Sequence, residues 1–260
     1  MMMAQVTTTR ILTLLSLYSS LNNTRRTFTH AAAMSSTTTT KKIFCYGDSL
    51  TAGTTPTDLV LHPYAPHLET ALNEMVVDAN TNIQVRWKGL PGWTASNMLE
   101  YQNAPDIGLK TFLNKFASND DSSSSQLDFV VILAGTNDIG QAFASQQQDK
   151  LNVEQTAQDI ASSIIALHEL AHEEGIPTLA IAIPPSGFQH AVSTANDLGD
   201  QTNAILEEWC SKKLMGFFEF PFGWSAGDER WAPDGLHLSE EGYRQVGAFL
   251  APMVYMNGCM

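Results

Sequence analysis

The chain has few cysteines, few basic residues and no long apolar run. Its three cysteines, Cys45, Cys210 and Cys259, cannot all pair within one chain and do not form the dense pattern of a disulfide-stabilised domain. No run of 18 apolar residues occurs, so we expect no transmembrane helix. The apolar fraction of 43% over 260 residues is that of an ordinary globular core, enough for one α/β domain and an appendage.

Basic residues are scarce after the first 40 positions. Three of the 14 Lys and Arg residues, Arg10, Arg25 and Arg26, lie in that first stretch, whereas the first acid is Asp48. The remainder therefore holds 11 basic against 27 acidic residues, a net charge of −16. Such a surface repels nucleic acid and anionic membrane surfaces, so we expect neither as a partner and no stable membrane insertion.

Residues 1–40 differ in composition from the rest. They are rich in Ser, Thr and Arg, contain no acid, and include one short apolar run at 11–18. We interpret them as a targeting leader or a disordered extension, with an organellar transit peptide favoured and a secretory signal as the runner-up. An internal start at Met34 would instead leave a cytosolic protein. The folded domain is predicted to span residues 41–256.

Strand and helix patterns alternate from residue 42 onward. Apolar runs predict strands at 42–46, 83–87, 128–134, 178–183 and 217–220. Helical spacing predicts helices at 64–77, 94–101, 107–116, 153–174, 195–214 and 239–253. Loops are expected at 54–63, 119–126, 140–148 and 184–197. This alternation predicts an α/β fold, a three-layer α/β/α sandwich around a doubly wound parallel sheet, with the ligand site at the carboxyl ends of the strands.

Four short segments carry polar residues that could act together: GDSL at 47–50, GLPGWTA at 89–95, GTND at 135–138 and DGLH at 234–237. The Ser49 hydroxyl is a poor nucleophile at neutral pH and needs a base. His237 can supply that base, and Asp234 can orient its ring. The first three segments each follow a predicted strand, so they should meet at one edge of the sheet.

Together, in this order, the four segments resemble the SGNH hydrolases, also called GDSL esterases and lipases, over about residues 42–255. The resemblance implies a flavodoxin-like fold and a Ser49–His237–Asp234 catalytic triad. It assigns the oxyanion hole to the backbone N–H groups of Ser49 and Gly92 and to the side-chain amide of Asn137. It implies no cofactor and no metal ion.

The same segments contain a second glycine and two further carboxylates. Gly92 is preferred to Gly89 as the oxyanion donor, because in the resembling family the catalytic glycine is often followed closely by Thr or Ser, as by Thr94 here. The carboxylates of Asp48 and Asp138 are expected to hold loops through backbone hydrogen bonds rather than to take part in chemistry.

We therefore predict a serine esterase that hydrolyses small short-acyl or aryl esters through an acyl-enzyme on Ser49, like the single-domain arylesterase branch. An acyltransferase, a lysophospholipase or a thioesterase could use the same site. A non-catalytic carbohydrate or lipid binder is a remote alternative. The acyl-chain preference and the oligomeric state stay open.

A second motif, HELAH at 168–172, matches the zinc-binding pattern H-E-x-x-H. In the extended form of that pattern a third histidine would fall at position 178, which is Thr178. The helix that carries the motif should run antiparallel to the strands, so its end should lie far from Ser49. We expect His168 and His172 to belong to a solvated helix face and not to a zinc site.

Overall fold

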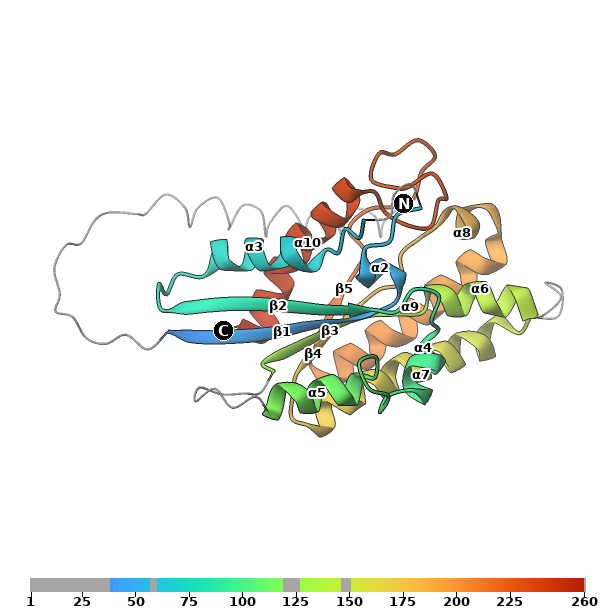
Figure 1. Cartoon of the computed structure of the whole chain (residues 1–260). Helices are drawn as coiled ribbons and strands as arrows, with labels where there is room; N and C mark the ends of the chain where they lie inside the picture. Colours follow the sequence, from blue (N-terminus) through green and yellow to red (C-terminus); the bar gives the residue numbers. More distant parts are fainter. Residues whose placement is uncertain (1–37, 57–59, 119–126, 146–150, 260) are drawn as a thin grey trace, which may run out of the picture. The chain divides into compact units, whose positions relative to one another are not determined.

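Five short apolar segments form one parallel sheet. The computed structural model describes residues 38–56, 60–118, 127–145 and 151–259 (Figure 1). The strands are β1 (Thr39–Gly47), β2 (Thr81–Gly89), β3 (Phe129–Leu133), β4 (Thr178–Ile181) and β5 (Gly216–Phe218). They lie in the order β2-β1-β3-β4-β5, and all neighbouring pairs are parallel. In this flavodoxin-like order the connections diverge at β1 and β3, which is where doubly wound sheets bind their ligands.

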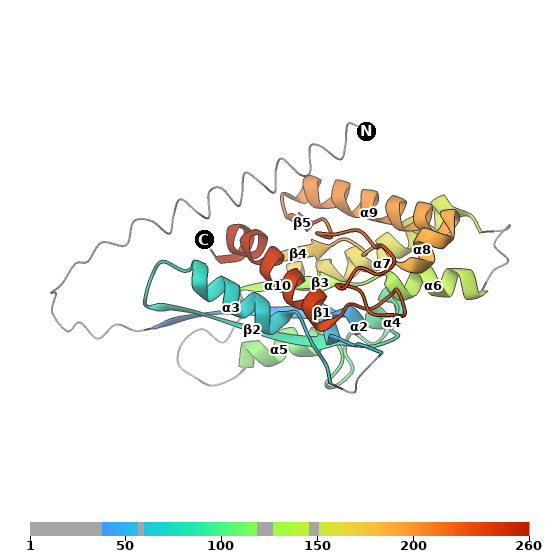
Figure 2. The same cartoon turned by 90° about the horizontal axis from the view of Figure 1, so that it is seen from above.

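Alternating side chains of the strands supply two separate cores. In β1, Ile43 and Cys45 belong to one core, whereas Phe44 and Tyr46 belong to the other. Helices α3 (Ala65–Met75) and α10 (Glu240–Val254) cover the first face (Figures 1 and 2). The second face is covered by α4 (Ala95–Glu100), α5 (Leu109–Ser118), α7 (Val153–Glu173) and α9 (Ser193–Lys213). The predicted three-layer sandwich is therefore confirmed.

Three short helices were not predicted from the sequence: α2 (Ser49–Ala52), α6 (Thr136–Ser145) and α8 (Gly187–Ala191). The predicted loop at 140–148 is therefore wrong over its first six residues, and the predicted loop at 184–197 contains α8 and the start of α9. Side-chain caps explain two of these helices, because Asp48 accepts from the Leu50 N–H and Ser186 accepts from the Gln189 N–H. The bounds of the predicted strands and helices lie within three residues of those observed. A π-helical turn, η2 (Tyr255–Cys259), ends the described chain.

Two sequence predictions fall mostly on residues that the structure does not describe. Of the predicted leader only residues 38–40 are described, and β1 already begins at Thr39. The predicted loop at 119–126 lies outside the described residues, and the domain bounds 41–256 stay a prediction. Cys45 is a buried free thiol, as predicted. Among the helices described here, none is long and apolar enough to cross a membrane.

Candidate active site

Ser49 lies at the carboxyl edge of the sheet, where β1 passes into α2. A Cβ on Gly47 would lie 2.1 Å from the carbonyl oxygen of Leu133, so only glycine lets β1 and β3 approach this closely. The next residue, Asp48, accepts a hydrogen bond from the Leu50 N–H at 2.9 Å and so caps α2. Ser49 thus becomes the first residue of a helix, and it is 6% exposed.

A continuous chain of hydrogen bonds joins Ser49, His237 and Asp234. The Nε2 atom of His237 lies 2.9 Å from the Oγ atom of Ser49. On the other side of the ring, Nδ1 lies 2.6 Å from the Oδ2 atom of Asp234. The second carboxylate oxygen, Oδ1, accepts the backbone N–H groups of Leu236 and His237, both at 3.0 Å. The structure thus brings together residues that are 188 positions apart, in the geometry needed to move a proton from Oγ to Nε2.

The loop that carries Asp234 and His237 is held at both ends. An antiparallel bridge between Trp231 and Leu238 closes its base. At its tip, the carbonyl oxygen of Gly235 accepts the N–H of Gly187, the first residue of α8, at 2.7 Å. These contacts fix the loop over the end of the sheet.

Opposing effects act on the carboxylate of Asp234. Partial burial would raise its pKa, but the hydrogen bonds from the His237 ring and from the N–H groups of Leu236 and His237 lower the pKa overall. Asp234 is therefore ionised at neutral pH and can stabilise a protonated imidazole.

Backbone geometry separates the two candidate glycines of segment 89–95. Gly92 has a φ of +79°, and a Cβ there would meet nothing within 4 Å, so the residue is glycine for its conformation and not for lack of space. Gly89 ends β2, and a Cβ there would lie 2.1 Å from the backbone nitrogen of Ala52. Packing thus explains Gly89, whereas the exposed Gly92 leaves its backbone open to a ligand.

Asn137 lies in the first turn of α6, directly after β3. Its Nδ2 atom donates to the carbonyl oxygen of Trp93 at 2.9 Å. This bond uses one of the two hydrogens on Nδ2. Segments 89–95 and 135–138 therefore touch through the residues next to Gly92.

The model of the GDSL-like lipase/acylhydrolase family matches residues 45–245. The chain belongs to this family. A search of curated proteins found no match.

Solved structures share the fold of this GDSL-family chain at low sequence identity. The native aryl esterase of M. smegmatis is 21% identical with a TM-score of 0.58, and the alignment covers 84% of this chain and 99% of that one. A lipase/acylhydrolase from Enterococcus faecalis is 20% identical with a TM-score of 0.54, over 82% and 95% of the two chains. Est24, a carbohydrate acetylesterase from Sinorhizobium meliloti, is 20% identical with a TM-score of 0.53, over 83% and 99%. These likenesses establish the fold, and family membership establishes the general class, an ester hydrolase.

Two buried carboxylates stand beside the site of this GDSL-family hydrolase. Asp48 is 0% exposed; burial raises its pKa to about 7, the Leu50 N–H opposes the rise, and the nearby Asp138 adds to it. Burial likewise raises the pKa of Asp138 to about 6, against the lowering effect of its bond with the Ala95 N–H. The prediction that both carboxylates hold backbone N–H groups is confirmed.

The second motif is placed differently from what the sequence predicts. His168 is 0% exposed, so the expectation of a solvated helix face is wrong for this residue. The Nδ1 atom of His168 and the Nε2 atom of His172 lie 2.8 Å and 3.0 Å from the hydroxyl of Thr178, and both rings pack on Trp209. Burial lowers the pKa of His168 to about 3, and the neighbouring His172 lowers it further. The two rings are thus part of the contact between α7, β4 and α9.

No group of three or more His, Cys, Asp or Glu residues within the described ranges could hold a metal ion.

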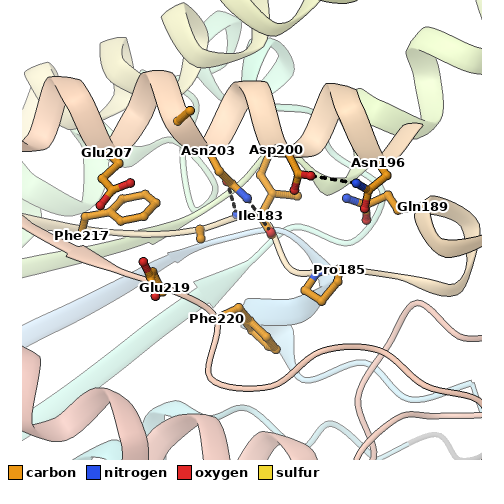
Figure 3. Close-up of a pocket in the computed structure, with 12 residues that line it drawn as sticks. Ile183, Pro185, Gln189, Asn196, Asp200, Asn203, Glu207, Phe217, Glu219 and Phe220 are labelled. Atoms are coloured by element: carbon orange, nitrogen blue, oxygen red, sulfur yellow. Dashed lines mark hydrogen bonds between the residues drawn. The ribbon is translucent and has the colours of Figure 1, made fainter. Parts of the chain in front are cut away.

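A pocket of about 350 Å³ lies between α9 and the ends of β4 and β5 (Figure 3). Asn203 lines this pocket. Its Oδ1 atom accepts the N–H of Ile183 at 2.8 Å, and its Nδ2 atom donates to the carbonyl oxygen of Ile183 at 3.0 Å. The carboxylates of the pocket belong to Asp200, Glu207 and Glu219, and the three residues joined by the hydrogen-bond chain do not line it.

Proposed function

We propose that this hydrolase is a serine esterase that cleaves small short-acyl or aryl esters through an acyl-enzyme on Ser49. The observation that carries the proposal is the hydrogen-bond chain from Ser49 Oγ through both nitrogens of His237 to Asp234. A purely structural role of Ser49 at the start of α2 would not explain why its hydroxyl faces a histidine whose other ring nitrogen faces a carboxylate. This arrangement is the one that nucleophilic catalysis by a hydroxyl requires.

In the first half of the reaction, Ser49 Oγ attacks the ester carbonyl carbon while its proton passes to His237 Nε2. Asp234 stabilises the imidazolium that forms and holds the ring by Nδ1. The tetrahedral intermediate then expels the alcohol, which takes the proton from Nε2, and leaves an acyl group on Oγ. In the second half, water gives its proton to Nε2 and attacks the acyl carbon, and Oγ leaves with that proton.

The negative oxygen of each tetrahedral intermediate needs donors aimed at it. We assign these to the N–H of Ser49, the N–H of Gly92 and the free hydrogen on Asn137 Nδ2. Ser49 is the first residue of α2, and the first N–H groups of a helix have no partner within it. The positive φ of Gly92 and the position of Asn137 after β3 support the other two assignments.

Aromatic residues next to these segments support an apolar substrate. Trp93 packs edge-on against Tyr101, with ring centroids 5.3 Å apart, and Phe143 packs edge-on against Phe188 at the same separation. Phe188 follows Gly187, which is bonded to the His237 loop, and it is 41% exposed. One related structure is named an aryl esterase, which agrees with an aryl ester, and another a carbohydrate acetylesterase, which agrees with a small acyl group. Acyl transfer, lysophospholipase and thioesterase activity remain alternatives with the same site.

The test compares the wild type with Ser49→Ala on p-nitrophenyl acetate, butyrate and octanoate, with and without a chelator. Ser162→Ala is the matched control, because Ser162 lies exposed on α7 and its hydroxyl donates to the carbonyl oxygen of Gln158 in the same helix. We expect turnover to vanish in Ser49→Ala alone and to ignore the chelator, with the short esters preferred. Equal turnover in all three proteins would refute the serine mechanism. An added alcohol that diverts the acyl group from free acid would favour the acyltransferase.

A further inference from the structure

Two residues in the first turn of α6 form hydrogen bonds with the segment that contains Gly92. Asn137 Nδ2 donates to the Trp93 carbonyl oxygen at 2.9 Å. The next residue, Asp138, accepts the Ala95 N–H with both carboxylate oxygens, at 2.9 Å and 3.2 Å. The two segments are more than 40 residues apart in sequence. The sheet brings them to the same edge, because β2 and β3 both pair with β1, and the two contacts of α6 join them directly beyond the ends of the strands.

The contact made by Asp138 is buried and has a defined geometry. Asp138 is 9% exposed and Ala95 is 0% exposed. Ala95 is the first residue of α4, whose start is also fixed by the capping box of Thr94 and Asn97. Asp138 itself lies in the first turn of α6, where the helix dipole favours a negative charge. One carboxylate thus joins the beginnings of two helices.

We propose that Asp138 is a positioning residue for the oxyanion site, which it serves by fixing the segment of Gly92 against the helix of Asn137. Asn137, the residue before Asp138, is bonded to Trp93, which is one position after Gly92. Ala95, which donates to Asp138, is three positions after Gly92. A donor that shifts by about 0.5 Å makes a longer and weaker hydrogen bond to a developing oxyanion, so a rigid link between the two donors favours turnover. The proposal rests on the serine mechanism given above.

The experiment deletes the same hydrogen bond from either side. Asp138→Ala removes the acceptor, together with the bond that Asp138 accepts from the backbone of Ser96, whereas Ala95→Pro removes only the donor at Ala95. Proline suits this position because Ala95 is the first residue of a helix and Thr94, with φ −79° and ψ 162°, already has the conformation that precedes proline. Asp78→Ala is the matched control, since Asp78 also accepts a backbone N–H, from Asn80, in the turn before β2 at the opposite edge of the sheet.

For each variant and for the double variant, kcat and KM are measured per active site, counted by complete reaction of Ser49 with a phosphonate. We expect each single change to lower kcat about tenfold or more while KM changes by less than about threefold, because the oxyanion donors that Asp138 positions act on the substrate mainly in the transition state. The double variant should lose no more than Asp138→Ala alone, since both changes remove the hydrogen bond between Asp138 and Ala95. The inhibition constant of phenylboronic acid, which forms a tetrahedral adduct on serine, should rise as kcat/KM falls.

A kcat within twofold of wild type in Asp138→Ala and Ala95→Pro, or losses that multiply in the double variant, would overturn the proposal. If these variants do not fold, Asp138→Asn keeps one acceptor oxygen and should show a smaller loss of kcat, about three- to tenfold, again with little change in KM. Full activity of Ser49→Ala would instead refute the serine mechanism itself. If Ser49→Ala loses activity but the Asp138 variants keep the kcat of wild type, only the positioning role of Asp138 is refuted.

Discussion

The buried carboxylate of Asp48 makes a quantitative prediction about the pH dependence of stability. Its Oδ1 atom accepts the Leu50 N–H at 2.9 Å, whereas its Oδ2 atom has no hydrogen-bond partner within the described part of the chain. Burial raises the pKa of Asp48 from 3.8 to about 7 in the folded protein. Between these two values the folded state binds more protons than the unfolded state, so stability falls as the pH rises from about 4 to about 7.

The magnitude follows from the shift. Three pKa units correspond to about 4 kcal/mol, of which about 2.5 kcal/mol develops between pH 5 and pH 8. Asp48→Asn keeps the shape and the acceptor for the Leu50 N–H but cannot ionise. The free energy of unfolding of Asp48→Asn minus that of wild type should therefore be about 2.5 kcal/mol larger at pH 8 than at pH 5.

Urea unfolding of both proteins at pH 5 and pH 8, with the m-values compared, measures this difference. Asp78→Asn is the control, because Asp78 is exposed and the N–H of Asn80 lowers its pKa, so its replacement should bring no gain at pH 8. If the free energies of unfolding of wild type and Asp48→Asn differ by the same amount at pH 5 and pH 8, the pKa of Asp48 is not raised by burial and the reasoning fails.

Three further predictions concern single side chains. Asn137→Ala should lower kcat about 10²- to 10³-fold, measured on p-nitrophenyl acetate, since it removes one oxyanion donor; a change in KM alone would contradict that role. Asp234→Asn should lower kcat about 10⁴-fold with the fold intact, because the amide favours the wrong ring tautomer of His237; circular dichroism checks the fold, and a loss below tenfold would contradict it. The pKa of His168 lies well below that of a free histidine because of burial, so folding loses stability as the pH falls below about 6.5. His168→Phe should therefore gain more in melting temperature at pH 5 than at pH 8, and equal gains would show that His168 is not buried neutral.

The sheet could be predicted from sequence because its signal is local. Each strand is a short apolar run, and in β1 the pairs Ile43 with Cys45 and Phe44 with Tyr46 supply the two cores. The short helices α6 and α8 could not be predicted in this way, because their first residues, GTND and SGF, have the composition of turns. What makes them helical is a cap such as Ser186 or docking at the end of a strand, which composition does not show.

The candidate site shows the same division. The roles of Ser49, Asp234 and His237 were proposed from residue types and order, and the structure places the three side chains within hydrogen-bond distance. The exposure of His168 in the H-E-x-x-H motif was predicted wrongly, because the partners that bury it come from other elements, Thr178 in β4 and Trp209 in α9. Helical spacing within one segment carries no information about such partners.

Asp48 and Asp138 occupy equivalent places around the proposed oxyanion site. Asp48 precedes Ser49, Asp138 follows Asn137, and each accepts a backbone N–H at the start of a short helix. Burial raises both pKa values, so each carboxylate that is ionised at neutral pH costs stability. A neutral isostere would avoid that cost, but an amide accepts fewer backbone N–H groups than a carboxylate. The two buried charges therefore oppose folding at the edge of the sheet where Asp48 caps the helix of Ser49 and where, in our proposal, Asp138 positions the oxyanion donors. An active site can reduce the stability of its own domain in this way.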